Sequence, residues 1–254
     1  MNIYEAIFVR KTNRHFLQDP IAPQQLQNLQ KTYDQLTSLF GAIETEMEIV
    51  DNRTAHLIKT GFRGVKAPYF LLFYTEDAPK SKLNVGCLMQ QMALHLTAAG
   101  YGNCFVTDLK VSRDRPAKES RILAGALAFG KTREEILRKA GQAKRLSLSD
   151  LCNCKEQPRK WMEQLLEAAR MAPSYANDQP WRFVIYDNRI HIFLKKQRSI
   201  KLEEMEEVNA GVMLANVLVA AEELWLDIDL VKQADLSKKD SDRKQYVLSI
   251  QMIR

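Results

Sequence analysis

The sequence has few of the motifs on which most enzyme chemistry depends. Only two of its four cysteines are close together, Cys152 and Cys154, and their Cys-x-Cys spacing is poor for zinc or a disulfide without further ligands. The four histidines are scattered. There is no phosphate-binding loop, and Gly100-Tyr-Gly102 lacks the third glycine of a dinucleotide fingerprint. The sequence therefore predicts no metal site, no nucleophilic catalysis by a side chain, and thiols kept reduced.

Long uncharged stretches and targeting segments are also scarce. Residues 83–107 carry no formal charge, but they include Asn84, Gln90, Gln91 and Asn103, which are costly to place in lipid. We expect a buried helix followed by a strand there, and no membrane span. The first residues contain an early acid and no apolar signal-peptide core, so a cytoplasmic protein is predicted.

Acidic residues are scarce in one segment. Residues 110–145 hold eleven Lys and Arg against four Asp and Glu, a net charge of +7 for this segment. The formal net charge of the whole chain is +6, so this segment accounts for all of the excess. This segment is either a solvated connector or a surface that attracts anions. A nucleic-acid partner is not expected, because the segment has one aromatic residue and no recognisable binding module.

The composition is that of a globular protein with a sizeable core, since 46% of the 254 residues are hydrophobic and 27% are charged. Apolar spacing, proline and glycine predict alternating helices and strands. The expected helices are 3–9, one beginning at Pro23, 52–62, 85–99 and 132–140; the expected strands are 47–50, 67–74 and 103–106, with 121–129 either strand or short helix.

Motifs recur in one order along the chain, which indicates an internal duplication. Residues 84–91 align with 209–216, 26–36 with 161–171, 67–70 with 179–182, and Arg10-Lys-Thr12 with Arg145-Leu-Ser147. The alternative is chance similarity between apolar helices. The predicted halves are 1–143 and 144–254, each an α+β unit with a mainly antiparallel sheet around a central helix.

The two halves differ in which polar motif they keep. The first has Arg10-Lys-Thr-Asn-Arg-His-Phe16, whose cations suit an anionic ligand. The second has Ala172-Pro-Ser-Tyr-Ala-Asn-Asp-Gln-Pro-Trp-Arg182, a proline-stiffened loop with a hydroxyl and amides that could hold a flat, polar-edged ligand. No comparable loop is evident in residues 40–66 ahead of Pro68.

These two motifs, with Gly100-Tyr-Gly-Asn-Cys104, resemble those of the FMN-dependent nitroreductases. In that family the two motifs lie a few tens of residues apart, whereas here they are about 160 residues apart. The family's homodimers build each FMN site at the subunit interface, with one motif from each subunit. The chain therefore resembles a tandem-fused, pseudo-dimeric variant, which implies one FMN per chain and is compatible with a monomer.

The resemblance also implies roles for single residues. Arg10, Lys11 and Thr12 would bind the phosphate and ribityl end of FMN, and Arg14 would approach the pyrimidine edge of the flavin. Lys144 and Arg145 would add a basic phosphate contact. In the second motif, Ser174 and Asn177 would hydrogen-bond the ring or ribityl oxygens, Pro173 would stiffen the loop, and Gln179 would either orient the loop or reach the flavin.

The function implied is an oxidoreductase that passes electrons from NAD(P)H to nitroaromatic, quinone or similar small acceptors by a ping-pong route, with the chemistry carried by the flavin and no catalytic side chain. Two other functions remain open. The chain could be a non-enzymatic FMN-binding protein that stores or senses the flavin. It could also be a scaffold without cofactor, whose basic connector binds acidic partners.

Overall fold

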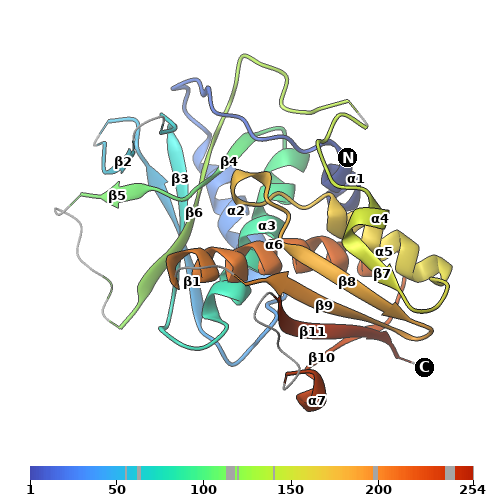
Figure 1. Ribbon diagram of the computed structural model, residues 1–254. Coiled ribbons are helices and arrows are strands. Elements are labelled where there is room, and N and C mark those ends of the chain that lie inside the picture. The colour runs from blue at the N-terminus through green and yellow to red at the C-terminus, as the bar shows by residue number, and fades with distance from the viewer. Residues whose placement is uncertain are drawn as a thin grey trace. The chain divides into compact units, whose positions relative to one another are not determined.

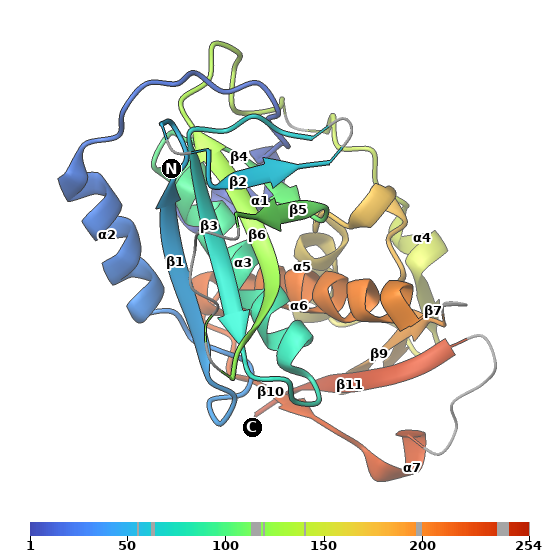
Figure 2. The ribbon, with the colours of Figure 1, turned by 90° about the vertical axis from the view of Figure 1, so that its left-hand side faces the viewer.

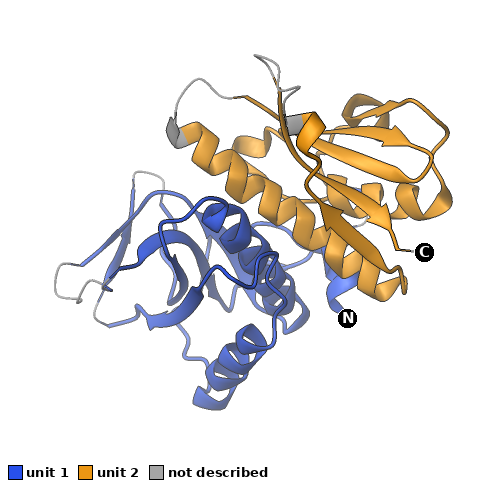
Figure 3. Ribbon diagram, turned by 90° about the horizontal axis from the view of Figure 1, so that it is seen from below, with its two compact units in different colours: residues 1–142 blue, residues 143–254 orange. Residues whose placement is uncertain are grey.

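The computed structural model describes residues 1–54, 56–61, 64–112, 118, 120–139, 141–196, 200–237 and 244–253. The chain divides into two compact units, Met1–Gln142 and Ala143–Arg254 (Figure 3). The boundary predicted from the sequence, between residues 143 and 144, lies one residue from this division. Whether the units are two copies of one segment stays a prediction.

The first unit contains three helices and six strands among its described residues (Figure 1). Its four-stranded sheet is antiparallel throughout and has the order β1-β3-β6-β4, and β2 pairs with β5 in a separate ribbon. The elements are α1 (Ile3–Val9), α2 (Pro23–Asp34), β1 (Thr45–Asp51), β2 (Ile58–Thr60), β3 (Tyr69–Thr75), α3 (Ser81–Ala98), β4 (Gly102–Val106), β5 (Leu109–Val111) and β6 (Ile122–Gly130).

Strand β3 is buried on both faces, as its unbroken apolar run predicts. Tyr69, Leu71 and Phe73 pack on the side of α3, while Phe70 and Leu72 pack with a second cluster that includes residues of β2 and β5. Helix α3 contacts β3, β4 and β6, and Figure 2 shows it behind the sheet. It is buried almost all round, which confirms the predicted central helix.

The second unit contains a five-stranded sheet of order β10-β11-β9-β8-β7, antiparallel except for the β7–β8 pair. Its elements are α4 (Leu148–Leu151), β7 (Cys152–Cys154), α5 (Lys160–Arg170), the 3-10 turn η1 (Tyr175–Asn177), β8 (Trp181–Tyr186), β9 (Arg189–Lys195), α6 (Ile200–Glu223), β10 (Ile228–Val231), α7 (Ala234–Ser237) and β11 (Lys244–Met252). Together the two units confirm the predicted α+β class with mainly antiparallel sheets.

The two units share an order of elements that corrects one sequence alignment. Apart from the short elements β2, β5, η1 and α7, each runs helix, strand, strand, long helix, strand, strand, through α2-β1-β3-α3-β4-β6 and α5-β8-β9-α6-β10-β11. The sheet orders match on the same scheme. Strand β8 therefore corresponds to β1 and not to β3, so aligning residues 67–70 with 179–182 is wrong by one strand. The counterpart of the loop at 171–180 is 35–44, and both loops have ten residues.

Two predicted helices, 52–62 and 132–140, are not formed by the residues that the structure describes there. Within 52–62, the described residues form a turn and strand β2, because the buried Asn52 side chain accepts a hydrogen bond from the Ile58 amide (2.8 Å) and donates to the Ile58 carbonyl (3.1 Å). Residues 132–139 are also non-helical, since Leu137 forms an antiparallel bridge with Arg10. Residues 121–129, left open from the sequence, lie almost wholly in strand β6.

The uncharged stretch at 83–107 forms most of α3 and all of β4. In the part of the chain that the structure describes, no helix combines the length and apolarity needed to cross a membrane.

Tryptophan environments differ sharply in the second unit. Trp181 begins β8 and is 0% exposed, as expected for a core residue. Trp225, just after α6, is 94% exposed and has a left-handed φ of 55°.

Candidate functional site

The first basic motif follows helix α1. Asn2 and Glu5 form a capping box at the start of this helix, and the Arg10 amide donates to the Ala6 carbonyl at its end. The chain then runs extended, with Arg10 bridged to Leu137 and the Asn13 amide bonded to the Asn103 carbonyl at 3.0 Å. The motif is thus fixed between β4 and the segment that follows β6.

Arg10 is a buried cation held by a chain of polar groups. The residue is 3% exposed, and its Nη1 donates to Asn103 Oδ1 at 2.9 Å. Asn103 Nδ2 in turn donates to Thr97 Oγ1 (2.9 Å), and Thr97 Oγ1 donates to the Ala93 carbonyl (2.8 Å). Because every link is buried, the guanidinium is held in one orientation by the end of α3 and the start of β4.

A second arginine lies beside Arg10 and was not predicted from the sequence. Arg138 donates through Nε (2.7 Å) and Nη2 to the backbone carbonyl of Arg10, and its own amide donates to the Val9 carbonyl. Burial lowers the pKa of its guanidinium below the usual range. No carboxylate of the described residues pairs with Arg138. Two adjacent arginines with this environment favour an anion.

The other residues of the motif differ in burial. Lys11 is partly exposed, and Thr12 and Arg14 are exposed. Arg14 and Arg10 lie close enough to Cys104 to oppose the rise that burial causes in the pKa of its thiol. Asn13 is 3% exposed, and neither polar atom of its side chain has a hydrogen-bond partner among the described residues. Such an orphaned amide needs a water or a ligand nearby.

The loop between α5 and β8 has a strained backbone. Ala176, Asn177 and Gln179 all have left-handed φ angles, of 48°, 59° and 49°. Each such residue other than glycine costs on the order of 1 kcal/mol, so surrounding contacts must hold it in place. Residues 175–178 are exposed, whereas the flanking Gln179 and Pro180 are buried.

Gln179 is the residue that holds the loop together. The residue is 4% exposed; its Oε1 accepts from the Leu146 amide (2.7 Å) and its Nε2 donates to the Asn177 carbonyl (3.1 Å). Its own amide donates to Ser174 Oγ at 2.9 Å. Of the two roles considered for Gln179, the geometry favours orienting the loop.

The side chains of Asn177 and Arg145 are hydrogen-bonded to each other. Arg145 Nη1 donates to Asn177 Oδ1 (2.8 Å), and Asn177 Nδ2 donates to the Lys144 carbonyl (3.1 Å). Arg145 also donates to the Met171 carbonyl. Lys144 and Arg145 therefore belong with the second-unit loop that carries Ser174 and Asn177.

The described residues contain no group of three or more His, Cys, Asp or Glu that could hold a metal ion. The polar groups that the structure brings together are instead cations, amides and hydroxyls.

The model of one protein family matches residues 2–221, and its description is "Putative TM nitroreductase". The chain belongs to this family. Membership implies an oxidoreductase, and the family resemblance found in the two sequence motifs is confirmed. No curated protein matches the chain.

Solved structures of similar fold include proteins of the same kind. A nitroreductase from Thermotoga maritima has a TM-score of 0.65 and 19% identity, over 100% of this chain and 94% of that one. A nitroreductase family protein from Clostridium difficile has a TM-score of 0.50 and 13% identity, over 62% of this chain and 100% of that one. A nitroreductase from Desulfitobacterium hafniense, described with bound FMN, has a TM-score of 0.44 and 16% identity, over 58% and 98%. At these identities the likeness concerns the fold.

Proposed function

We propose that the chain is an FMN-dependent oxidoreductase that takes electrons from NAD(P)H and passes them to nitroaromatic, quinone or similar small acceptors. The observation that carries the proposal is the pair formed by Arg10 and Arg138, in a chain of the nitroreductase family. Arg10 is buried and oriented by Asn103, and Arg138 binds the Arg10 carbonyl without a carboxylate partner among the described residues.

The residues of the first unit fit the phosphate end of FMN. A phosphate is a dianion near neutral pH and prefers guanidinium forks. We propose that Arg10, Lys11 and Thr12 bind it as the resemblance implies, that Arg14 approaches the flavin ring, and that Arg138 adds a cation. The amide of the buried Asn13, which has no partner among the described residues, is a further polar group that a bound molecule or water could satisfy.

In the loop of the second unit, we propose that Ser174 and the backbone contact a flat ligand, and that Asn177 does not. The Asn177 side chain is already bonded to Arg145 and Lys144, so we propose that it shapes the loop. The Ser174 hydroxyl accepts from Gln179 and keeps a proton to donate. With Pro173 it would bind FMN through that hydroxyl and the exposed backbone of 175–178. Lys144 and Arg145 would support the loop rather than bind phosphate.

We also propose that the units derive from one duplicated segment and that the chain binds one FMN through both motifs. The shared order of elements supports the duplication. One flavin is proposed because residues 35–44, the first-unit counterpart of the loop, have Gly41 and Ile43 where the second unit has Asn177 and Gln179.

In the proposed reaction the protein's residues bind and orient. FMN, when bound, would supply the electron-transfer chemistry, so no side chain needs to act as nucleophile. A cation such as Arg14 near the pyrimidine edge would favour the reduced, more negative flavin. Arg10, fixed by its buried chain of hydrogen bonds, would keep the cofactor in one position.

The test is FMN binding by the purified full chain, measured by its visible spectrum, with NAD(P)H turnover measured on the same samples. We expect one FMN per chain and reduction of a quinone or nitroaromatic. Arg10→Ala and Ser174→Ala should each weaken FMN binding, the former about tenfold or more because a charged hydrogen-bonding pair is lost.

Two arginine variants serve as matched controls. Arg53 and Arg159 form exposed pairs with Asp51 and Asp187, so Arg53→Ala and Arg159→Ala should leave FMN affinity unchanged. FMN binding without turnover would support the storage or sensing alternative. A colourless protein that takes up no FMN would rule out the proposed function, and sensitivity to only one of the two motif variants would contradict the two-motif site.

A further inference from the structure

The sheet of the second unit has a polar side that the proposed FMN residues do not use. Trp181, Phe183 and Ile185 alternate along β8 into the buried core. Arg182 and Val184 therefore point to the opposite face. On that face Arg182 is directly opposite Phe193 of β9, and Val184 is opposite Asn153 of β7.

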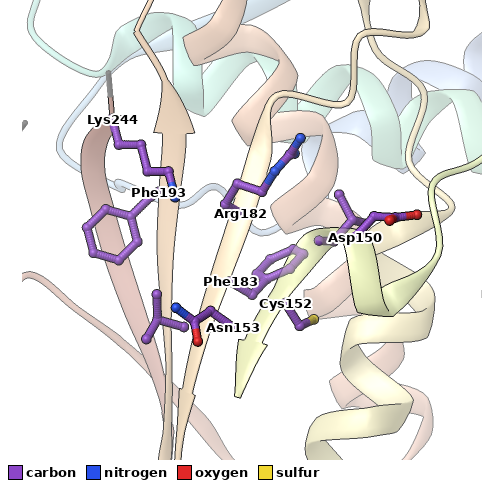
Figure 4. A pocket seen from close by; sticks show the side chains of 9 residues that line it. Asp150, Cys152, Asn153, Arg182, Phe183, Phe193 and Lys244 are labelled. Carbon is purple, nitrogen blue, oxygen red and sulfur yellow. The ribbon is translucent and has the colours of Figure 1, made fainter. Parts of the chain in front are cut away.

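A cavity of about 340 Å³ is associated with these residues. Arg182, Val184, Phe193 and Asn153 line it, with Asp150 of α4 and Lys244 of β11. Figure 4 shows Arg182 on the strand between the one that carries Phe193 and the segment that carries Asp150. The volume is within the range of small-molecule sites, at its lower end.

One nitrogen of the Arg182 guanidinium is bonded to the backbone, and one edge of the group is open to a ligand. Nη1 donates to the backbone carbonyls of Gln179 (2.9 Å) and Trp181 (2.6 Å). Its Nε and Nη2 make no hydrogen bond within the described chain. The Nε–Nη2 edge is one of the two edges through which a guanidinium binds a carboxylate with two parallel hydrogen bonds. Because the opposite nitrogen is anchored, little orientation entropy remains to be lost on binding.

Asp150 is the one carboxylate among the described residues that line the cavity, and it already accepts hydrogen bonds. Asp150 Oδ2 accepts from the Ser147 hydroxyl (2.6 Å) and the Ser147 amide (3.2 Å). These bonds, and to a lesser extent the nearby charge of Arg182, hold the pKa of Asp150 below the usual range. No ion pair joins Asp150 to Arg182 among the described residues. Lys244 also lines the cavity, so its described lining holds two cations and one carboxylate.

The rest of the lining is suited to a ring. Val184 and Phe193 present apolar surface beside Arg182, and Asn153 adds an amide that can donate or accept. We propose that this cavity binds a small aromatic carboxylate, with the carboxylate on the Nε–Nη2 edge of Arg182 and the ring against Val184 and Phe193. The site does not depend on the proposed FMN function.

Benzoate is the probe, titrated into the purified full chain by calorimetry. Benzyl alcohol tests the carboxylate, and acetate tests the ring. We expect benzoate to bind more tightly than either analogue. Arg182→Gln should weaken benzoate binding by roughly tenfold or more, since a bidentate charged contact is lost. Arg182→Lys should also weaken it, because an ammonium lacks the planar fork.

Arg189→Gln is the matched control, since Arg189 is on the same sheet but is not among the described residues that line the cavity, and its side chain donates to that of Asn188. It should bind benzoate like the unchanged protein. Val184→Glu keeps Arg182 and adds a carboxylate that competes with benzoate for its guanidinium. This variant should not bind benzoate. Circular dichroism would establish that each variant is folded.

Three outcomes would overturn the site: no benzoate binding by the unchanged protein, equal affinity for benzyl alcohol, or equal binding by folded Arg182→Gln. The last result would place any bound benzoate elsewhere on the chain. None of the three bears on FMN binding, so the proposed function is tested independently.

Discussion

At the scale of single residues, a few buried polar side chains fix the arrangement of the candidate site. Asn103 orients Arg10, and Gln179 closes the strained loop of the second unit. The sequence motifs predicted Arg10 and the loop residues, because hydroxyls, amides and cations in those patterns have a defined chemistry. They did not predict Arg138, whose contact with Arg10 depends on a bridge between residues more than a hundred positions apart.

A buried histidine provides a pH-dependent prediction at this scale. His191 is 5% exposed, and its Nδ1 lies 2.6 Å from Ser249 Oγ, which lies 2.6 Å from the Tyr246 hydroxyl. Burial, and to a lesser extent the charge of Arg189, lower the pKa of His191 below its ordinary value. The unfolded chain therefore binds a proton more readily than the folded one as pH falls through about 6.5.

The stability contributed by neutral His191 is thus present above about pH 6.5 and is lost as pH falls toward the lowered folded pKa, at about 1.4 kcal/mol for each unit of depression. Urea unfolding at pH 7.5 and 5.5 would measure this. His191→Gln removes the titrating group, so its loss of stability between the two pH values should be smaller. An equal loss in both proteins would show that other groups are responsible.

At the scale of elements, each unit ties the loop after its first long helix to its central helix through an asparagine. In the first unit Asn84 Oδ1 accepts from the Phe40 amide at 3.2 Å. In the second unit Asn209 Oδ1 accepts from the Tyr175 amide at 3.0 Å. The sequence aligned these two asparagines, but only the structure shows that they hold equivalent loops.

Replacing the second of these asparagines should loosen the loop that carries Ser174. Asn209 is buried, and Asn209→Ala leaves the Tyr175 amide without its acceptor, at a cost of about 1–3 kcal/mol in the free energy of unfolding. We expect faster hydrogen exchange in residues 173–179, measured by mass spectrometry. Asn84→Ala is the control: it should lower stability by a similar amount without changing exchange in that peptide. Unchanged exchange in Asn209→Ala would refute the anchoring role.

The elements show where local patterns are sufficient. Strand β3 and helix α3 were predicted because an unbroken apolar run and an apolar surface all round have few other solutions. Residues 52–62 and 132–139 were mispredicted because partners distant in sequence decide them. Strand β2 pairs with β5, about fifty residues away, and Leu137 pairs with Arg10.

At the scale of the whole molecule, the α+β class and the family followed from the sequence, while the correspondence between strands did not. The motif Gln179-Pro-Trp resembles Ala67-Pro-Tyr, and this local resemblance alone made β8 the counterpart of β3. The order of strands in a sheet depends on long-range hydrogen bonding, and this order makes β8 the counterpart of β1. The duplication itself stays a proposal, supported by this shared order.

All three tryptophans of the chain, Trp161, Trp181 and Trp225, lie in the second unit. Intrinsic indole fluorescence is therefore a reporter of that unit alone and does not sense the first. Trp225, at 94% exposure, should be quenched readily by iodide, whereas Trp181, at 0%, should be shielded until the second unit opens. Comparing this emission with far-ultraviolet dichroism, to which both units contribute, would show without any added label whether the two units unfold together.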